Sequence, residues 1–127
     1  MSALVLDAGA FVAVDRGDRA MVARLRACAV AGLDLRTTGA VVAQVWRDPK
    51  GRQVGLARLL AAVDVRAVDQ LLGREAGVLL GRSGTNDAVD ATVVAISAVG
   101  DRIATSDARD ISRLVAGSGR AILVVAV

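Results

Sequence analysis

The sequence contains no histidine, and this absence excludes several familiar kinds of catalytic site. A Ser-His-Asp triad, a zinc ion bound by histidine and an acid–base pair of histidines all need a residue type that the chain lacks. The single cysteine, Cys28, excludes an intramolecular disulfide and a cysteine-rich metal site. Carboxylates are therefore the main candidates for chemistry.

Aromatic residues are also scarce, at 2% of the chain, whereas hydrophobic residues make up 54%. The core must then be built from Ala, Val, Leu and Ile. Such a core suits strands that helices bury on both faces better than it suits a β-sandwich. At 127 residues, without a linker or repeat, the chain fits a single domain over residues 1–127.

No apolar run approaches the roughly 18 residues that a membrane-spanning helix needs. The apolar segment near the N-terminus ends at Asp7 and does not resemble a signal peptide. We therefore expect a cytoplasmic protein with no membrane partner.

The basic residues are almost all of one kind. Lys and Arg together number 16 against 13 acids, and Lys50 is the only lysine. The guanidinium group matches the geometry of phosphate, which favours a nucleic-acid partner. A GC-rich genome, which favours Arg codons, would give the same bias.

Strand and helix patterns alternate from one end of the chain to the other. The hydrophobic periodicity predicts strands over 3–6, 33–37, 63–68, 102–105 and 121–125. It predicts helices over 8–14, 19–31, 39–46, 54–62, 69–81, 87–99 and 108–116. This order predicts a three-layer α/β/α fold with a mainly parallel sheet of about five short strands.

Four aspartates stand where such a fold places its ligand site, beyond the carboxyl ends of the strands. Asp7 ends the first strand, Asp107 follows the fourth, and Asp87 and Asp90 share a face at the start of an apolar helix. Converging carboxylates repel one another, and a divalent cation relieves the repulsion. Oxygen ligands favour Mg²⁺ or Mn²⁺, which activate water for attack on a phosphodiester.

Each aspartate also has a purely structural interpretation. Asp7 and Asp107 could cap the helices that follow them, and Asp87 is better explained as an N-cap than as a ligand. Asp90 is the hardest to explain without a cation, because it lies at the rim of a strongly apolar helix.

Three segments, LVLDAGAFVA, TNDAVDATVVAIS and DRIATSDARDI, resemble PIN-domain proteins. More narrowly, the chain is similar over essentially its whole length to the VapC type of toxin from bacterial toxin–antitoxin pairs. This resemblance implies a PIN-like fold and Mg²⁺- or Mn²⁺-dependent endoribonuclease activity, often on tRNA or rRNA. It also implies a homodimer and inhibition by a cognate antitoxin.

The resemblance assigns roles to individual positions. It implies that the catalytic, metal-binding acids are Asp7, Asp90 and Asp107. Asp87 would be an accessory metal ligand. Thr105 and Ser106 lie in the matching TSD segment, where a hydroxyl can orient the last acid or a bound water.

One position departs from the family pattern. PIN domains usually carry a glutamate on the helix after the second strand, and the matching residue in TTGAVVAQVWRDP is Gln44. Its amide can contact a metal or a bound water but carries no charge. Either the site binds metal more weakly, which we favour because the other acids are intact, or the domain is catalytically impaired and binds RNA or protein.

RNA contacts are predicted for Arg47, Lys50 and Arg52, which cluster after the helix bearing Gln44. Ordinary solvated surface charge explains them equally well. A receiver-like domain that accepts a phosphoryl group is a weaker alternative, because Lys50 lies in a turn and not at the end of a late strand.

Overall fold

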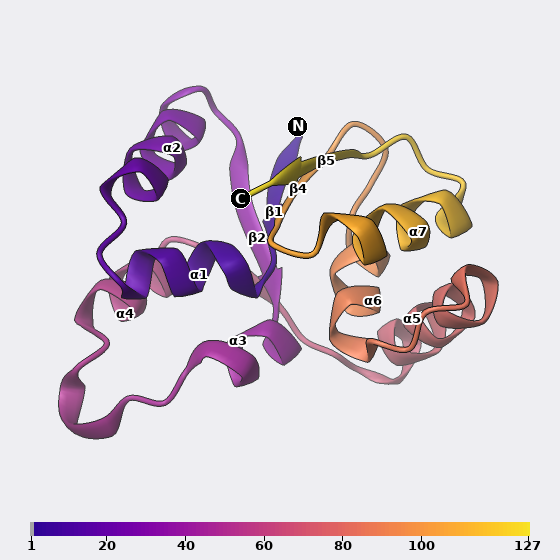
Figure 1. Ribbon diagram of the computed structural model, residues 1–127, viewed down its shortest axis with the longest axis horizontal. Coiled ribbons are helices and arrows are strands. Elements are labelled where there is room, and N and C mark those ends of the chain that lie inside the picture. Colours follow the sequence, from indigo (N-terminus) through magenta and orange to yellow (C-terminus); the bar gives the residue numbers. More distant parts are fainter. Residues whose placement is uncertain (1) are drawn as a thin grey trace.

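The computed structural model describes residues 2–127, and its centre is a five-stranded parallel sheet (Figure 1). The strands are β1 (Ala3–Leu6), β2 (Asp34–Thr38), β3 (Asp64–Arg66), β4 (Arg102–Thr105) and β5 (Leu123–Ala126). Their order across the sheet is β3-β2-β1-β4-β5, and every pair is parallel. The mainly parallel sheet expected from the sequence is confirmed.

Helices cover both faces of this sheet. They are α1 (Ala8–Asp15), α2 (Arg19–Val30), α3 (Gly39–Val45), α4 (Val54–Ala61), α5 (Gln70–Ser83), α6 (Ala88–Ala95) and α7 (Ala108–Ser118), with a short 3₁₀ turn, η1 (Pro49–Gly51). Figure 1 shows α1, α2 and α4 on one side of the sheet and α5, α6 and α7 on the other. The predicted three-layer architecture is confirmed.

The central strand β1 is buried along its whole length, as its continuous apolar sequence predicts. It pairs with β2 on one side and β4 on the other. From β1 the chain first builds outward to β3 and then crosses back to β4 and β5, so the order of connection reverses between β1 and β4. Such a reversal is where open α/β sheets place their ligands.

The structure corrects the predicted end of α6, which stops at Ala95 and not at residue 99. The Ser97 hydroxyl donates to the Val93 carbonyl, and the Arg120 guanidinium donates to three carbonyls at this end of the helix: Val94, Ala95 and Ser97. These bonds satisfy the last carbonyl groups of the helix, which have no partner within it. A capping residue this far along the chain leaves no local signal.

The edge strands are also shorter than predicted. β3 covers three residues, all exposed, and β5 begins at Leu123 and not at residue 121. Each edge strand has one neighbour only, so pairing ends where that neighbour ends. Across the described part of the chain, residues 2–127, none of the helices combines the length and the apolar character needed to cross a bilayer.

Candidate metal centre

Asp7 lies directly after β1 and is held in place by two hydrogen bonds. Its side chain is 4% exposed. One carboxylate oxygen, Oδ1, accepts from the backbone N–H of Ala8 over 2.8 Å, and Oδ2 accepts from the Thr105 hydroxyl over 2.8 Å. Asp7 therefore does cap α1, as its structural interpretation proposed, and it also faces the end of β4.

Thr105, the last residue of β4, joins two of the predicted acids. Its buried hydroxyl donates to Asp7 and accepts from the backbone N–H of Asp107 over 2.9 Å. One hydroxyl thus fixes the Asp7 carboxylate relative to the start of the chain segment that leads into α7.

The start of α6 carries the other two acids. Asp87 is the N-cap of α6, and its Oδ1 accepts from the backbone N–H of Asp90 over 3.0 Å. Asp90 is 4% exposed, and its Oδ2 is buried without a hydrogen-bond partner among the described residues. A buried carboxylate oxygen with no partner is unfavourable unless it meets a proton or a cation.

The surroundings of Asp90 oppose its ionisation. Burial raises the pKa of its carboxyl group to about 8, and the negative charge of Asp7, hydrogen bonding with Asp107 and the charges of Asp87 and Asp107 act in the same direction. Asp7 and Asp87 therefore belong to the same electrostatic site as Asp90 and Asp107. A divalent cation would reverse the balance by favouring the ionised form.

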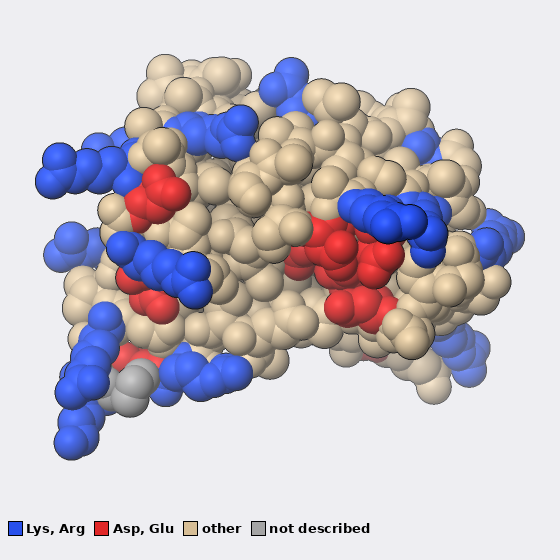
Figure 2. Space-filling model, in the orientation of Figure 1, with Lys and Arg blue, Asp and Glu red and all other residues tan. Residues whose placement is uncertain are grey.

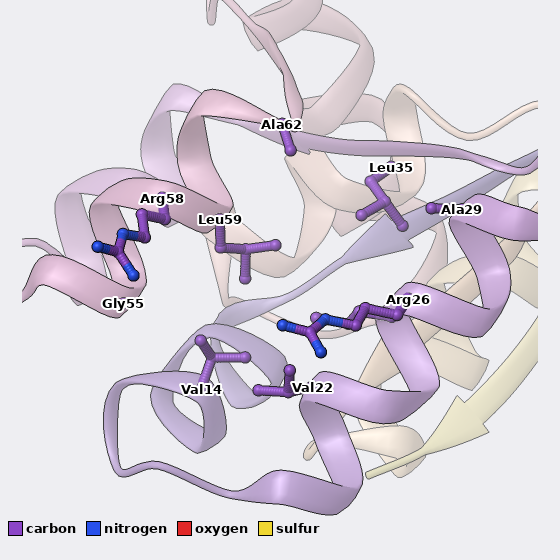
Figure 3. A pocket seen from close by; sticks show the side chains of 10 residues that line it. Val14, Val22, Arg26, Ala29, Leu35, Gly55, Arg58, Leu59 and Ala62 are labelled. Atoms are coloured by element: carbon purple, nitrogen blue, oxygen red, sulfur yellow. The ribbon is translucent and has the colours of Figure 1, made fainter.

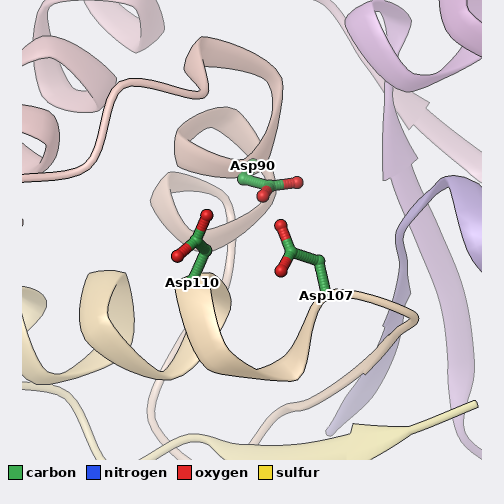
Figure 4. A group of neighbouring side chains, drawn as sticks. All are labelled: Asp90, Asp107 and Asp110. Atoms are coloured by element: carbon green, nitrogen blue, oxygen red, sulfur yellow. The ribbon is translucent and has the colours of Figure 1, made fainter.

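Three acids come close enough to share one ion. Figure 4 shows Asp90 on α6 facing Asp107 and Asp110 on α7, and one oxygen of each lies within 4.8 Å of the others. Asp107 occupies the N-cap position of α7 without making a side-chain capping bond, so its structural interpretation is not realised. The sequence analysis missed Asp110, although its spacing of three from Asp107 places both on one helix face.

Ser106 contributes close packing at the same place. A Cβ atom added at Gly9 would lie 2.7 Å from Ser106 Oγ and 2.8 Å from its Cβ. The first turn of α1 thus rests directly against the segment between β4 and α7. The Ser106 side chain itself is exposed.

The remaining predicted site residues lie outside the group of three acids. Gln44 is exposed in the last turn of α3. Arg47, Lys50 and Arg52 are exposed in the segment between α3 and α4. The Arg47 guanidinium donates to the carbonyls of Ala43 and Trp46 at the end of α3, over 3.1 and 2.7 Å.

An apolar cavity of about 380 Å³ lies elsewhere, between α1, α2, α4 and β2. Figure 3 shows Val14, Val22 and Leu59 around it, with Arg26 and Arg58 among the lining residues. Among the residues that the structure describes, none of those lining it is acidic. In Figure 2 the largest patch of acidic side chains lies over the region of α6 and α7, and smaller acidic groups lie among basic side chains on the left of the view. The cavity and the acids are therefore separate features.

Neither a family model nor a curated protein sequence matches the chain. Several solved structures share its fold, including the following two. A chain of VapBC2 from Rickettsia felis, solved bound to a DNA fragment from the promoter, has a TM-score of 0.70 at 12% identity and covers 96% of this chain and 98% of that one. A chain of FitAB bound to an IR36 DNA fragment has a TM-score of 0.63 at 13% identity, covering 95% and 94%.

These likenesses extend over nearly the whole of each chain. At 12% and 13% identity they establish the fold alone. The PIN-like fold predicted from the sequence is confirmed.

Proposed function

We propose that the protein is a Mg²⁺- or Mn²⁺-dependent endoribonuclease that acts as the toxin of a toxin–antitoxin pair. The observation that carries the proposal is the Asp90 carboxylate. It is buried, its Oδ2 has no hydrogen-bond partner among the described residues, and it offers an oxygen that lies within 4.8 Å of oxygens of Asp107 and Asp110. The fold shared with a chain of VapBC2 supports the same assignment.

The donor set fits a hard divalent cation. Asp90, Asp107 and Asp110 would hold the ion, with Asp7 and Asp87 adding negative charge beside it. When bound, the ion lowers the pKa of a water molecule and neutralises charge that develops on the phosphodiester. Asp110 would supply the negative charge that Gln44 lacks.

The protein's own groups preorganise this site. Thr105 holds Asp7 and the Asp107 backbone, and Asp87 holds the first turn of α6, which carries Asp90. The metal-free site is thereby kept in place by hydrogen bonds that do not need the ion. Such preorganisation reduces the reorganisation that metal binding requires.

The second candidate function is binding of RNA or protein without cleavage, and Gln44 is the observation that favours it. Incubation of total RNA with Mn²⁺ separates the two functions. We expect cleavage by the wild type and none by Asp7→Asn. Asp69→Asn is the matched control, because Asp69 caps α5 and asparagine caps a helix equally well. Binding without cleavage by all three proteins would establish the second function.

The proposal includes a cognate antitoxin as partner. The apolar cavity offers a surface for the apolar face of a helix, and Arg26 and Arg58 favour acidic residues on that helix. A short open reading frame directly upstream should encode it. Co-purification of that product with wild type, but not with Leu59→Asp, is the expected result, and Leu71→Asp on exposed α5 is the control.

The proposal also includes a homodimer and a tRNA or rRNA substrate. Light scattering after gel filtration measures the first, with twice the mass of 13.0 kDa expected. Sequencing of the cleaved ends of total RNA identifies the second.

A further inference from the structure

The segment between α3 and α4, residues 46–53 (the α3–α4 loop), is organised by one buried amide. Gln53 is 7% exposed. Its Oε1 accepts from the backbone N–H groups of Arg47 and Asp48 over 2.7 and 2.5 Å. Its Nε2 donates to the Val45 carbonyl over 2.9 Å and to Asp15 Oδ2 over 3.0 Å. Both hydrogens of the amide and both lone pairs of its oxygen are therefore used.

These four bonds tie the α3–α4 loop to the ends of two helices. Val45 is the last residue of α3 and Asp15 is the last residue of α1. The loop is therefore anchored on both sides, although its own sequence is polar. Replacement of the amide would release all four partners together.

The loop holds two residues in an unfavourable backbone conformation. Asp48 has φ 37° and Lys50 has φ 59°, both in the left-handed region that residues with a Cβ rarely adopt. Such conformations persist only where the surroundings enforce them, and they concentrate at functional sites. Gln53 supplies this enforcement by accepting from the backbone N–H of Asp48.

The loop carries an excess of positive charge, with three basic residues against the single acid Asp48. The Arg47 guanidinium is engaged by carbonyls at the end of α3, whereas Lys50 and Arg52 extend into solvent. Figure 2 shows basic side chains at the end of the molecule where Figure 1 places this loop, on the same face as the acidic patch. A polyanion lying across this face would meet both features.

We propose that Gln53 is a positioning residue that holds the α3–α4 loop as a phosphate-binding element, with Lys50 and Arg52 contacting the backbone of the RNA. The identity of the polyanion as RNA rests on the proposed function. Two ammonium or guanidinium groups at a fixed separation add affinity without reading base sequence. On this proposal, the left-handed backbone conformation of Asp48 and Lys50 is kept in the free protein because it presents Lys50 toward the substrate.

Binding of fluorescein-labelled bulk tRNA, measured by anisotropy in EDTA from 50 to 300 mM KCl, tests the proposal without cleavage. Each phosphate contact contributes roughly 0.7 to 0.9 to the slope of log affinity against log salt. We expect Lys50→Ala/Arg52→Ala to lower the slope by about 1.5, and Gln53→Met to lower it with both charges still present. Asp15→Asn is the matched control, because its amide oxygen still accepts from Gln53.

Lys50→Gly separates the loss of a charged contact from a loss of stability. Glycine relieves the left-handed strain but removes the charge, so we expect an unchanged or higher unfolding midpoint together with a reduced slope. Equal slopes for wild type, Lys50→Ala/Arg52→Ala and Gln53→Met would overturn the inference. If the slopes are equal but the wild type cleaves RNA, the proposed nuclease stands. If the slopes differ as expected but no RNA is cleaved, only the proposed nuclease is overturned. A wild type that binds no tRNA overturns the inference, whereas the proposed nuclease is decided separately by cleavage of total RNA with Mn²⁺.

Discussion

The hydroxyl of Thr105 donates a 2.8 Å hydrogen bond to Asp7, a residue 98 positions away in the sequence. The bond crosses from the end of β4 to the end of the neighbouring strand β1. The same oxygen accepts from the backbone N–H of Asp107. One side chain therefore sets the relative position of two acids that the sequence analysis assigned to a metal.

Replacement of Thr105 by valine should weaken both the fold and the metal site. The change removes a buried bond to a carboxylate, which costs roughly 1–3 kcal/mol of the free energy of unfolding. Urea unfolding measures this loss. The increase in melting temperature on addition of Mn²⁺ should also shrink, because Asp7 is less well oriented.

Two variants separate these effects. Thr105→Ser keeps the hydroxyl and should preserve the Mn²⁺ response. Ser97→Ala removes another buried hydroxyl bond, at the opposite end of α6, and should lower stability without changing that response. A Mn²⁺ response of Thr105→Val equal to that of the wild type would count against the role of Thr105 in the site.

The raised pKa of Asp90 predicts how the stability of the metal-free protein depends on pH. The folded protein keeps the Asp90 proton up to about pH 8, whereas an ordinary aspartate releases it near 3.8. Between these values the folded state binds more protons than the unfolded state, so the free energy of unfolding falls as the pH rises. The fall is at most about 1.4 kcal/mol per pH unit.

Urea unfolding in EDTA at pH 5.5, 7.0 and 8.5 measures this slope, and the difference between wild type and Asp90→Asn isolates the contribution of Asp90. The free energy of unfolding of Asp90→Asn should depend less on pH than that of the wild type. At high pH the variant should be the more stable of the two. The opposite sign, with wild type gaining stability from pH 5.5 to 8.5 relative to Asp90→Asn, would contradict the origin assigned to the shift.

Local patterns in the sequence were sufficient to predict the three layers of this fold. The apolar run before Asp7 and the one before Thr105 each predicted a buried strand, and both strands lie where expected. Parallel order then brings their carboxyl ends to one edge of the sheet. Asp90 stood out as an acid on an apolar helix, and it is the acid with the unpartnered oxygen.

Other features depend on contacts between distant segments and left no local pattern. Arg120 ends α6 from 25 residues away, measured to Ala95. Gln53 bonds to Asp15 across 38 residues. Both are single polar residues in ordinary surroundings, so periodicity and capping rules cannot separate them from surface residues. Asp110 could have been predicted, because its spacing of three from Asp107 is visible in the sequence.

An acid at position 44, where the resemblance to PIN domains predicts a glutamate, should strengthen metal binding. Gln44→Glu adds a negative charge on α3, and we expect tighter Mn²⁺ binding by calorimetry. Gln44→Ala should change affinity little, whereas Asp110→Asn should weaken it severalfold if Asp110 supplies the missing charge. Affinity that is unchanged or weaker in Gln44→Glu would contradict a position for residue 44 near the ion.

Gly9→Ala should destabilise the protein through contact with Ser106. The new Cβ would lie 2.7 Å from Ser106 Oγ, 2.8 Å from its Cβ and 3.1 Å from its backbone nitrogen. Rotation of the hydroxyl cannot relieve the second contact, so α1 must shift, at a cost of roughly 1–3 kcal/mol in urea unfolding. Gly73→Ala on α5, with open space around it, should instead stabilise by roughly 0.5–1 kcal/mol.

A second substitution at position 106 tests whether this contact is the cause. Gly9→Ala/Ser106→Gly removes the two closest atoms and should recover part of the loss relative to Ser106→Gly alone, whereas Ser106→Ala keeps the Cβ atom and should recover little. Because the shifted helix begins beside Asp7, Gly9→Ala should also bind Mn²⁺ more weakly than Gly73→Ala. Equal recovery by glycine and alanine at position 106 would mean that the hydroxyl, and not the Cβ atom, causes the loss.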